Sequence, residues 1–174
     1  MAIIRLIALI LSLAFFLFSC SAAKNNSLSY QEKPFRAVIT WQIDSLSLAA
    51  KLTSSPESDS ATLEFTSPSS LEGVILKKEG EKITLTLNEL EISEAHLSRL
   101  AEITDFFKID ASIKKSSVTT ISGTKLNCLQ MLDANGEIFT VYLYPSSEIP
   151  RRITGKLYSQ TVTLDVVSFE FIPK

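Results

Sequence analysis

The sequence predicts a mainly β domain with one helix, an α+β fold in which a curled antiparallel sheet or incomplete β-barrel is covered by a single amphipathic helix. Most segments between residues 35 and 172 alternate apolar and polar residues with a period of two, which is typical of half-buried strands. Short connections rich in Gly, Pro, Ser or Asn separate these segments, as expected for antiparallel neighbours. A single segment, residues 94–108, has apolar residues at helical spacing.

The first half of the sheet is predicted from alternation that starts at Phe35. The strands expected there cover residues 35–43, 46–52, 61–66, 74–78 and 83–87. Pro68 ends the third of them, because proline lacks an amide hydrogen for the ladder. Gly80 lies in the turn of a hairpin. The apolar phase slips by one residue at Asn88-Glu89, which predicts a β-bulge that bends the sheet.

The helix is predicted from residue 94 to residue 108, with a length of about 22 Å. Ser93 is a suitable N-cap, and Glu94 lies in the first turn, where the helix dipole favours a negative charge. The apolar face consists of Leu97, Leu100, Ala101, Thr104 and Phe107, and Phe106 widens it.

Alternation returns after the helix. The strands expected in this second half start near Val118 and include residues 126–132, 138–144, 149–156 and 159–172. Asn135-Gly136 predicts a tight hairpin turn, because both central residues of such a turn need positive φ. The last strand changes phase between Val166 and Val167. The total is nine or ten strands joined by short turns, and the one long helix is expected to cover one sheet face.

The N-terminus has the features of an export signal. Arg5 precedes thirteen residues, Leu6 to Phe18, that are apolar except for Ser12. As a helix they would measure about 20 Å, short of the ~30 Å hydrocarbon core of a membrane. The run ends at Leu17-Phe18-Ser19-Cys20, which resembles the lipobox of bacterial lipoproteins. That resemblance implies cleavage before Cys20 and attachment of lipid to this residue, as diacylglycerol and an acyl chain such as palmitate.

The resulting organisation is a lipoprotein signal peptide at residues 1–19, a lipidated Cys20 with a flexible polar tether at residues 20–33, and a folded domain at residues 34–174. Two alternatives stay open for the N-terminus: an ordinary signal peptide cut elsewhere, and an uncleaved anchor. The lipoprotein interpretation places the protein on the extracytoplasmic face of a membrane, and on the outer membrane if the cell has one.

Composition argues against several function classes. A net charge of −2 gives no basic face for nucleic acid. His96 is the only histidine, so a multi-histidine metal site is excluded, and a solvated surface role is expected for it. No Gly-x-Ser-x-Gly elbow occurs and the five glycines are scattered, so neither a hydrolase nor a phosphate-binding loop is indicated. Cys128 is expected to be a small buried residue. We therefore expect no enzyme, no metal and no cofactor apart from the lipid on Cys20.

Several phrases resemble small lipoproteins whose folded part is like the lipoprotein carriers LolA and LolB and the sensor regulator RseB. These phrases are Phe35–Ile39, Leu63–Val74, Gly80–Leu85, Pro150–Ile153 and Val167–Phe171. The resemblance covers about residues 34–172. It implies a half-barrel that wraps a hydrophobic cavity with helix as a lid, and a site for lipid or acyl chains. These carriers usually have more than one helix, whereas this sequence predicts one, so the cavity is either smaller or filled by side chains.

The leading functional hypothesis is a non-enzymatic, membrane-anchored module that binds an apolar ligand, a lipid or acyl chain, between curled sheet and helix. The alternative is a protein-interaction or envelope-sensing module with a filled core that offers a sheet edge or face to an envelope protein. The candidate pocket residues are Trp41, Phe65, Leu97, Leu100, Phe107 and Phe139. The pairs Lys114-Lys115 and Arg151-Arg152 are expected to be solubilising charges or to face anionic lipid heads.

Replacing Cys20 with Ala should release the protein from membranes or leave it unprocessed. Two or three acyl chains, at about 0.8 kcal/mol per buried CH₂, make anchorage effectively permanent, and the variant lacks the thiol that accepts the lipid. Metabolic labelling with a clickable palmitate followed by fractionation measures both effects, with Cys128→Ala as the control that keeps its label. If Cys20→Ala still partitions with labelled lipid, the lipobox assignment is wrong.

Overall fold

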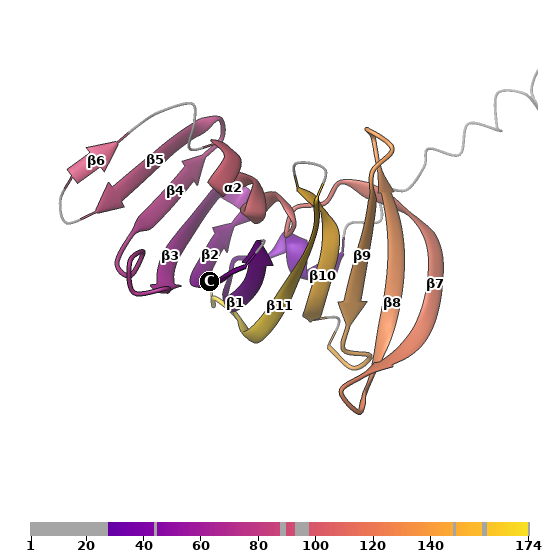
Figure 1. Ribbon diagram of the computed structural model, residues 1–174. Helices are drawn as coiled ribbons and strands as arrows, with labels where there is room; N and C mark the ends of the chain where they lie inside the picture. Colours follow the sequence, from indigo (N-terminus) through magenta and orange to yellow (C-terminus); the bar gives the residue numbers. More distant parts are fainter. Residues whose placement is uncertain are drawn as a thin grey trace, which may run out of the picture.

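The computed structural model describes residues 28–43, 45–87, 90–92, 98–147, 149–157 and 160–173. They form one large antiparallel sheet with very little helix, and the sheet is not closed into a barrel (Figure 1). Its strands are β1 (Phe35–Ile43), β2 (Leu46–Ser55), β3 (Ser60–Ser67), β4 (Ile75–Glu79), β5 (Lys82–Leu87), β6 (Leu90–Ile92), β7 (Ala111–Ile121), β8 (Thr124–Asp133), β9 (Ile138–Leu143), β10 (Pro150–Leu157) and β11 (Gln160–Phe171).

The order of the strands in the sheet is β6-β5-β4-β3-β2-β1-β11-β10-β9-β8-β7. Every neighbouring pair is consecutive in sequence except β1 and β11, which bring the two ends of the domain together at the centre. The mainly β, antiparallel architecture predicted from the alternation is therefore confirmed. The sheet is curled, and α2 (Ser98–Asp105) lies beside the end of β4 (Figure 1). The predicted cover of one sheet face by a single helix stays a prediction.

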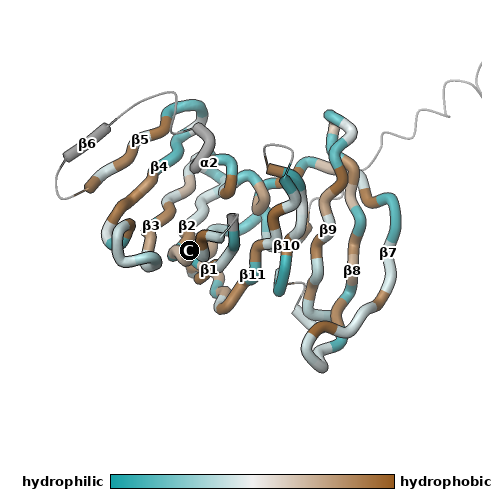
Figure 2. The backbone as a smooth tube through the Cα atoms, in the orientation of Figure 1, coloured by the Kyte–Doolittle hydropathy of each residue, from teal (hydrophilic) through white to brown (hydrophobic). Residues whose placement is uncertain are grey.

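The hydrophobic core lies on the concave face of this sheet. Hydrophobic and hydrophilic residues alternate along the strands (Figure 2), because successive side chains point to opposite faces. In β3 the apolar residues Ala61, Leu63 and Phe65 are buried, whereas Thr62 and Glu64 between them are half-exposed. A single cluster of buried residues joins both halves of the sheet to the segment around α2.

The predicted helix differs from the observed one. Its expected start, with Leu97, lies outside the described residues, and the described helix α2 ends at Asp105 instead of Lys108. Beyond it, Phe107 N donates to Thr104 O and Lys108 N to Asp105 O, at distances of 3.1 and 2.9 Å. These three-residue spacings tighten the chain into turns. They end the α-helix before Phe106, because both that residue and its neighbour turn into the core.

Two turn predictions are also corrected. Leu87 pairs with Leu90 in antiparallel register, so the chain reverses between β5 and β6, whereas the phase slip predicts a bulge; Asn88-Glu89 themselves lie outside the described residues. At Asn135-Gly136 the connection is a longer loop in which Gly136 has positive φ and Asn135 does not. The Asp133 carboxylate accepts hydrogen bonds from the amides of Asn135 and Glu137 there, at 2.9 and 2.7 Å.

The phase change expected in the last strand is confirmed as a β-bulge. Val38 of β1 pairs with Ser168, and the next residue of β1, Ile39, pairs with Val166, so Val167 has no partner in this ladder. Its side chain is 64% exposed. The extra residue lets Phe169 return to the concave side after the bulge, where it stacks on Phe35 with ring centroids 4.7 Å apart.

The folded part begins earlier than the predicted boundary at Pro34. Residues Ser29–Glu32 form a short 3₁₀ helix, η1, and Tyr30 in it is fully buried against the sheet. The end of the expected flexible tether therefore belongs to the core. Cys20 and the expected signal peptide lie outside the described residues. Within the described part of the chain, no helix combines the length and apolar character needed to span a membrane.

Replacing Phe65 with Ala should lower the free energy of unfolding by about 3–5 kcal/mol, because its side chain is only 2% exposed and its ring lies 6.0 Å from that of Trp41. Urea denaturation measures the change. Thr66→Ala, an exposed position on the same strand, is the matched control and should change stability by about 0.5 kcal/mol at most. Equal effects of the two substitutions would contradict the assigned register of β3.

Candidate ligand-binding site

The most distinctive local structure is the crossing segment, residues 105–110, which leaves α2 and passes over the concave face. Ion pairs tie it to the first half of the sheet. Asp105 Oδ1 lies 2.5 Å from Lys78 Nζ of β4, and Lys108 Nζ lies 2.7 Å from Asp59 Oδ1 in the β2–β3 connection. The Lys108 ammonium hydrogen-bonds Asp59 and holds the pKa of that carboxyl below its usual range.

Two consecutive phenylalanines of the crossing segment reach different parts of the sheet. Phe107 packs on Phe35 of β1, with ring centroids 5.8 Å apart. Phe106 meets Phe139 of β9 edge to face at 5.6 Å. Gly155 of β10 makes room for that contact, because a Cβ there would lie 2.6 Å from the Phe139 ring and 2.9 Å from the Phe106 ring. The crossing segment thus joins the two halves of the sheet through aromatic contacts.

A recess of about 460 Å³ opens beside the crossing segment, between it, the β8–β9 loop and the end of β10. Its apolar lining consists of Phe106, Ile109, Phe139 and Leu157. Charged residues surround the apolar part: Glu102, Asp105, Lys108, Asp110, Asp133, Glu137 and Lys156. Several of these charges are already engaged, in the ion pairs of the crossing segment and in the Asp133 turn. The recess therefore combines an apolar floor with a polar rim, as small-ligand sites commonly do.

The six predicted pocket residues separate into three groups. Phe139 borders the recess. Trp41, Phe65 and Phe107 are buried in the core cluster. Leu97 lies outside the described residues, and Leu100 belongs to α2, whose first turn is described in its backbone alone. The structure thus brings one of the six residues into the recess wall.

Sequence reasoning misses three residues that matter here. In the sequence, Phe106 only widens the apolar face of the predicted helix, and Gly155 is one of five scattered glycines. Tyr30 falls in the predicted polar tether. A glycine inside a predicted strand is a recognised sign of close approach by another group, and this was the available signal for Gly155. No comparable local signal marks Tyr30, because its neighbours are polar.

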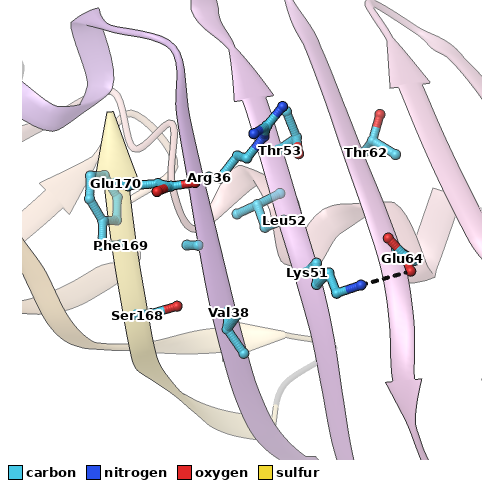
Figure 3. A pocket seen from close by; sticks show the side chains of 11 residues that line it. Arg36, Val38, Lys51, Leu52, Thr53, Thr62, Glu64, Ser168, Phe169 and Glu170 are labelled. Atoms are coloured by element: carbon cyan, nitrogen blue, oxygen red, sulfur yellow. Dashed lines mark hydrogen bonds and ion pairs between the residues drawn. The ribbon is translucent and has the colours of Figure 1, made fainter. Parts of the chain in front are cut away.

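A second hollow lies on the convex face, across β11, β1, β2 and β3. It measures about 550 Å³ and its side chains are largely charged or hydroxylated, with Arg36, Lys51, Glu64 and Ser168 among them (Figure 3). Lys51 Nζ and Glu64 Oε1 form an ion pair across it at 3.0 Å. Ala37 and Leu52 also border this hollow but are buried in the core, so its accessible side chains are mainly polar, and we assign the candidate site to the recess.

The basic pairs have different environments. Arg152 makes a two-point contact with Asp165, at 2.8 and 2.9 Å, and Arg151 donates to Val166 O at 3.1 Å. These arginines bind neighbouring β11. Lys114-Lys115 are exposed at a register shift of β7.

The described residues contain no group of three or more His, Cys, Asp or Glu side chains placed to hold a metal ion. Cys128 is a half-buried free thiol of β8, and His96 lies outside the described residues.

No family model matches the chain, and no curated protein matches its sequence. Solved structures do match. The crystal structure of an uncharacterized conserved protein from Thermus thermophilus has a TM-score of 0.52 and 16% identity, over 81% of this chain and 80% of that one. A LolA superfamily protein from Nitrosomonas europaea has a TM-score of 0.46 and 10% identity, over 87% and 91% of the two chains. The Mycobacterium tuberculosis lipoprotein LppX has values of 0.42 and 12%, over 79% and 86%.

A structure named as a LolA superfamily protein is thus among those that match, in line with the resemblance noted in the sequence. At identities of 10–16% these likenesses concern the fold alone. The chain has an open antiparallel half-barrel, with a recess beside the segment that crosses its concave face.

Replacing Gly155 with Ala should lower the free energy of unfolding by about 1–3 kcal/mol, because the added methyl group must displace both the Phe106 and the Phe139 rings. Thr154→Ala, one residue earlier on the opposite face, is the control with a smaller effect. In a double-mutant cycle, Phe139→Leu should recover part of the loss by making room for the methyl group. Strict additivity of the two substitutions would contradict the close approach at Gly155.

Proposed function

We propose that this chain is a lipid-anchored, extracytoplasmic binding module that holds an acyl chain or another apolar group in the recess, without covalent chemistry. The observation that carries the proposal is the recess itself. Its floor is apolar, its volume of about 460 Å³ lies in the range of ligand pockets, and it is located between the helix-derived segment and the sheet.

The segment around α2 is proposed to act as the lid of this site. In α2 Ala101 and Ile103 are buried, and Thr104 closes a hydrogen bond of 2.6 Å to Ala101 O. The ion pairs of Asp105 and Lys108 attach the lid to the sheet at its exposed margin, where such pairs contribute little to stability. Opening the lid would therefore disrupt few strong polar interactions, which suits a site that must admit a ligand. The predicted contributions of Leu97 and Leu100 to the lid remain part of this proposal.

The anchor on Cys20 would keep the module close to its ligand source. Seven residues separate Cys20 from the folded Leu28, which makes eight steps of about 3.5 Å in a fully extended chain, so the fold would begin within about 28 Å of the membrane surface. A lipid that leaves the bilayer would then meet the recess after a short path. The partners implied are the membrane and its lipids.

An interaction with an envelope protein is the second candidate, and a specific observation favours it. The sheet edge at β7 is eleven residues long, and among the described strands only β8 pairs with it. Its Val118 is 57% exposed. A long edge with free backbone donors and acceptors is a template for an added strand.

Replacing Ala134 with Trp should weaken binding of a fluorescent fatty acid by at least about tenfold, because Ala134 is an exposed residue of the recess wall and a large side chain there would occupy the cavity. Ile138→Trp is the matched control, since Ile138 is 61% exposed at the first position of β9 and is absent from the recess wall. Its affinity should stay within about twofold of the original. Native mass spectrometry of the protein purified from membranes should also detect bound lipid.

Lipid-free protein that binds no apolar probe would contradict the proposed function. A partner captured on β7, lost on replacing Val118 with Pro because proline cannot continue a strand ladder, would then establish the second candidate.

A further inference from the structure

Tyr30 of η1 packs on the concave side of the sheet, against aromatic residues of the central strands β1 and β11. Its ring makes edge-to-face contacts with Phe35 at 6.4 Å and with Phe169 at 6.2 Å. Phe35 in turn contacts Phe107. We call Phe35, Phe107 and Phe169 the aromatic cluster. The cluster belongs to the sheet and the crossing segment, whereas Tyr30 comes from the chain that precedes them.

The Tyr30 hydroxyl is fully buried and has no hydrogen-bond partner among the described residues. Burial raises the pKa of this hydroxyl; Gln31 acts in the opposite direction but does not meet hydrogen-bond geometry with it. The Gln31 side chain instead accepts from Leu28 N and donates to Ile109 O. A buried hydroxyl without a partner has lost its hydrogen bonds to water and gained none in return, so Tyr30 packs well through its ring and poorly through its oxygen.

The segment that carries Tyr30 is joined to the domain without strand pairing. The hydrogen bond from Gln31 N to Leu28 O, 2.8 Å, is internal to η1. The contact of Gln31 with Ile109 O is long, at 3.5 Å. The ladder of the sheet starts only beyond it, and Pro34 O accepts from Ile172 N at 2.9 Å. Residues 28–33 can therefore withdraw from the concave face while every strand pair stays intact.

The aromatic cluster and the recess are both bordered by the crossing segment. Phe107 belongs to the cluster, and its neighbour Phe106 lines the recess. Ile109 lines the recess too, and its carbonyl accepts the hydrogen bond from Gln31. The hydrogen bond from Gln31 to Ile109 O links the segment that carries Tyr30 to the recess wall, so a chain-like ligand in the recess lies next to that segment.

We propose that the aromatic cluster is a second part of the ligand site, which takes the far end of an acyl chain, and that Tyr30 occupies it in the ligand-free protein and is displaced by the ligand. This inference rests on the proposed function. Displacement exchanges one apolar contact surface for another and returns the Tyr30 hydroxyl to water. It also lengthens the tether between Cys20 and the fold from seven residues to thirteen, so the reach of the domain from the membrane grows from about 28 Å (eight steps) to about 49 Å (fourteen steps).

The test uses the full-length chain in membrane vesicles and palmitate that carries a diazirine near its methyl end, with adducts assigned to residues by mass spectrometry. Tyr30→Ala should raise labelling at Phe35 and Phe169 about tenfold, because it removes the competing side chain. Tyr30→Phe should lower it about tenfold, because this side chain fills the cluster without burying a hydroxyl. Tyr144→Ala, a half-buried tyrosine outside the cluster, should leave labelling within about twofold.

Labelling at Phe139 and Leu157 reports on the recess independently. The probe could label the cluster to the same extent in both Tyr30 variants as in the original protein, while still labelling the recess residues. In that case the displacement of Tyr30 is wrong and the proposed function stands. Absence of labelling at both the cluster and the recess would overturn both proposals. Tyr30→Phe keeps the shape of the side chain, so its result decides the question even where Tyr30→Ala fails to fold.

Discussion

The structure depends on one constraint: an open sheet with an apolar concave face must be covered by a segment too short to be a second sheet or a helix layer. The crossing segment meets this constraint by sending adjacent phenylalanines to opposite halves of the sheet, Phe107 to Phe35 and Phe106 to Phe139. In a continuing α-helix these two side chains would differ in direction by about 100° and could not both lie flat against a curved surface. The helix therefore stops at Asp105, and the turns that follow contribute their side chains to the core.

The same constraint explains how the sheet is joined. Pairing of β1 with β11 places the first and last strands at the centre, so the half-barrel can curl without closing. The bulge at Val167 adds curvature at this central seam, and a register shift in β7 next to Lys115 adds it near one edge. Exposed lysines at that shift discourage edge-to-edge pairing of copies, while the rest of β7 stays open. An open sheet leaves two edges, and of the two described here β7 is much longer than β6.

Much of the sheet could be predicted from the sequence because alternation is a local property that burial on one face imposes directly. Pro68, Gly80 and the phase change at Val166-Val167 were correctly interpreted for the same reason. Features set by contacts distant in sequence could not be predicted. The short helix η1 is ordered because Tyr30 meets Phe35 and Phe169, which a polar local sequence does not reveal. The Asn135-Gly136 loop differs from the prediction for a local reason, because the nearby Asp133 carboxylate accepts hydrogen bonds from two loop amides. Of the candidate site, Phe139 could be found as an aromatic strand residue, whereas the requirement for glycine at position 155 follows from the rings of Phe106 and Phe139, which approach it only in the fold.

The core also differs from one selected for stability alone. Two buried polar atoms have no partner among the described residues, the Tyr30 hydroxyl and the Trp41 indole nitrogen. Each costs free energy that a phenylalanine at the same place would not, and natural cores seldom retain such groups without a use. Tyr30 borders the crossing segment, and Trp41 packs beside Phe65 towards the other end of β1. A concave face that is well packed but leaves two polar atoms without hydrogen bonds suits a protein that exchanges a side chain for a ligand in its interior. The Arg152–Asp165 contact lies on the opposite, convex face, so the proposed exchange would leave it intact.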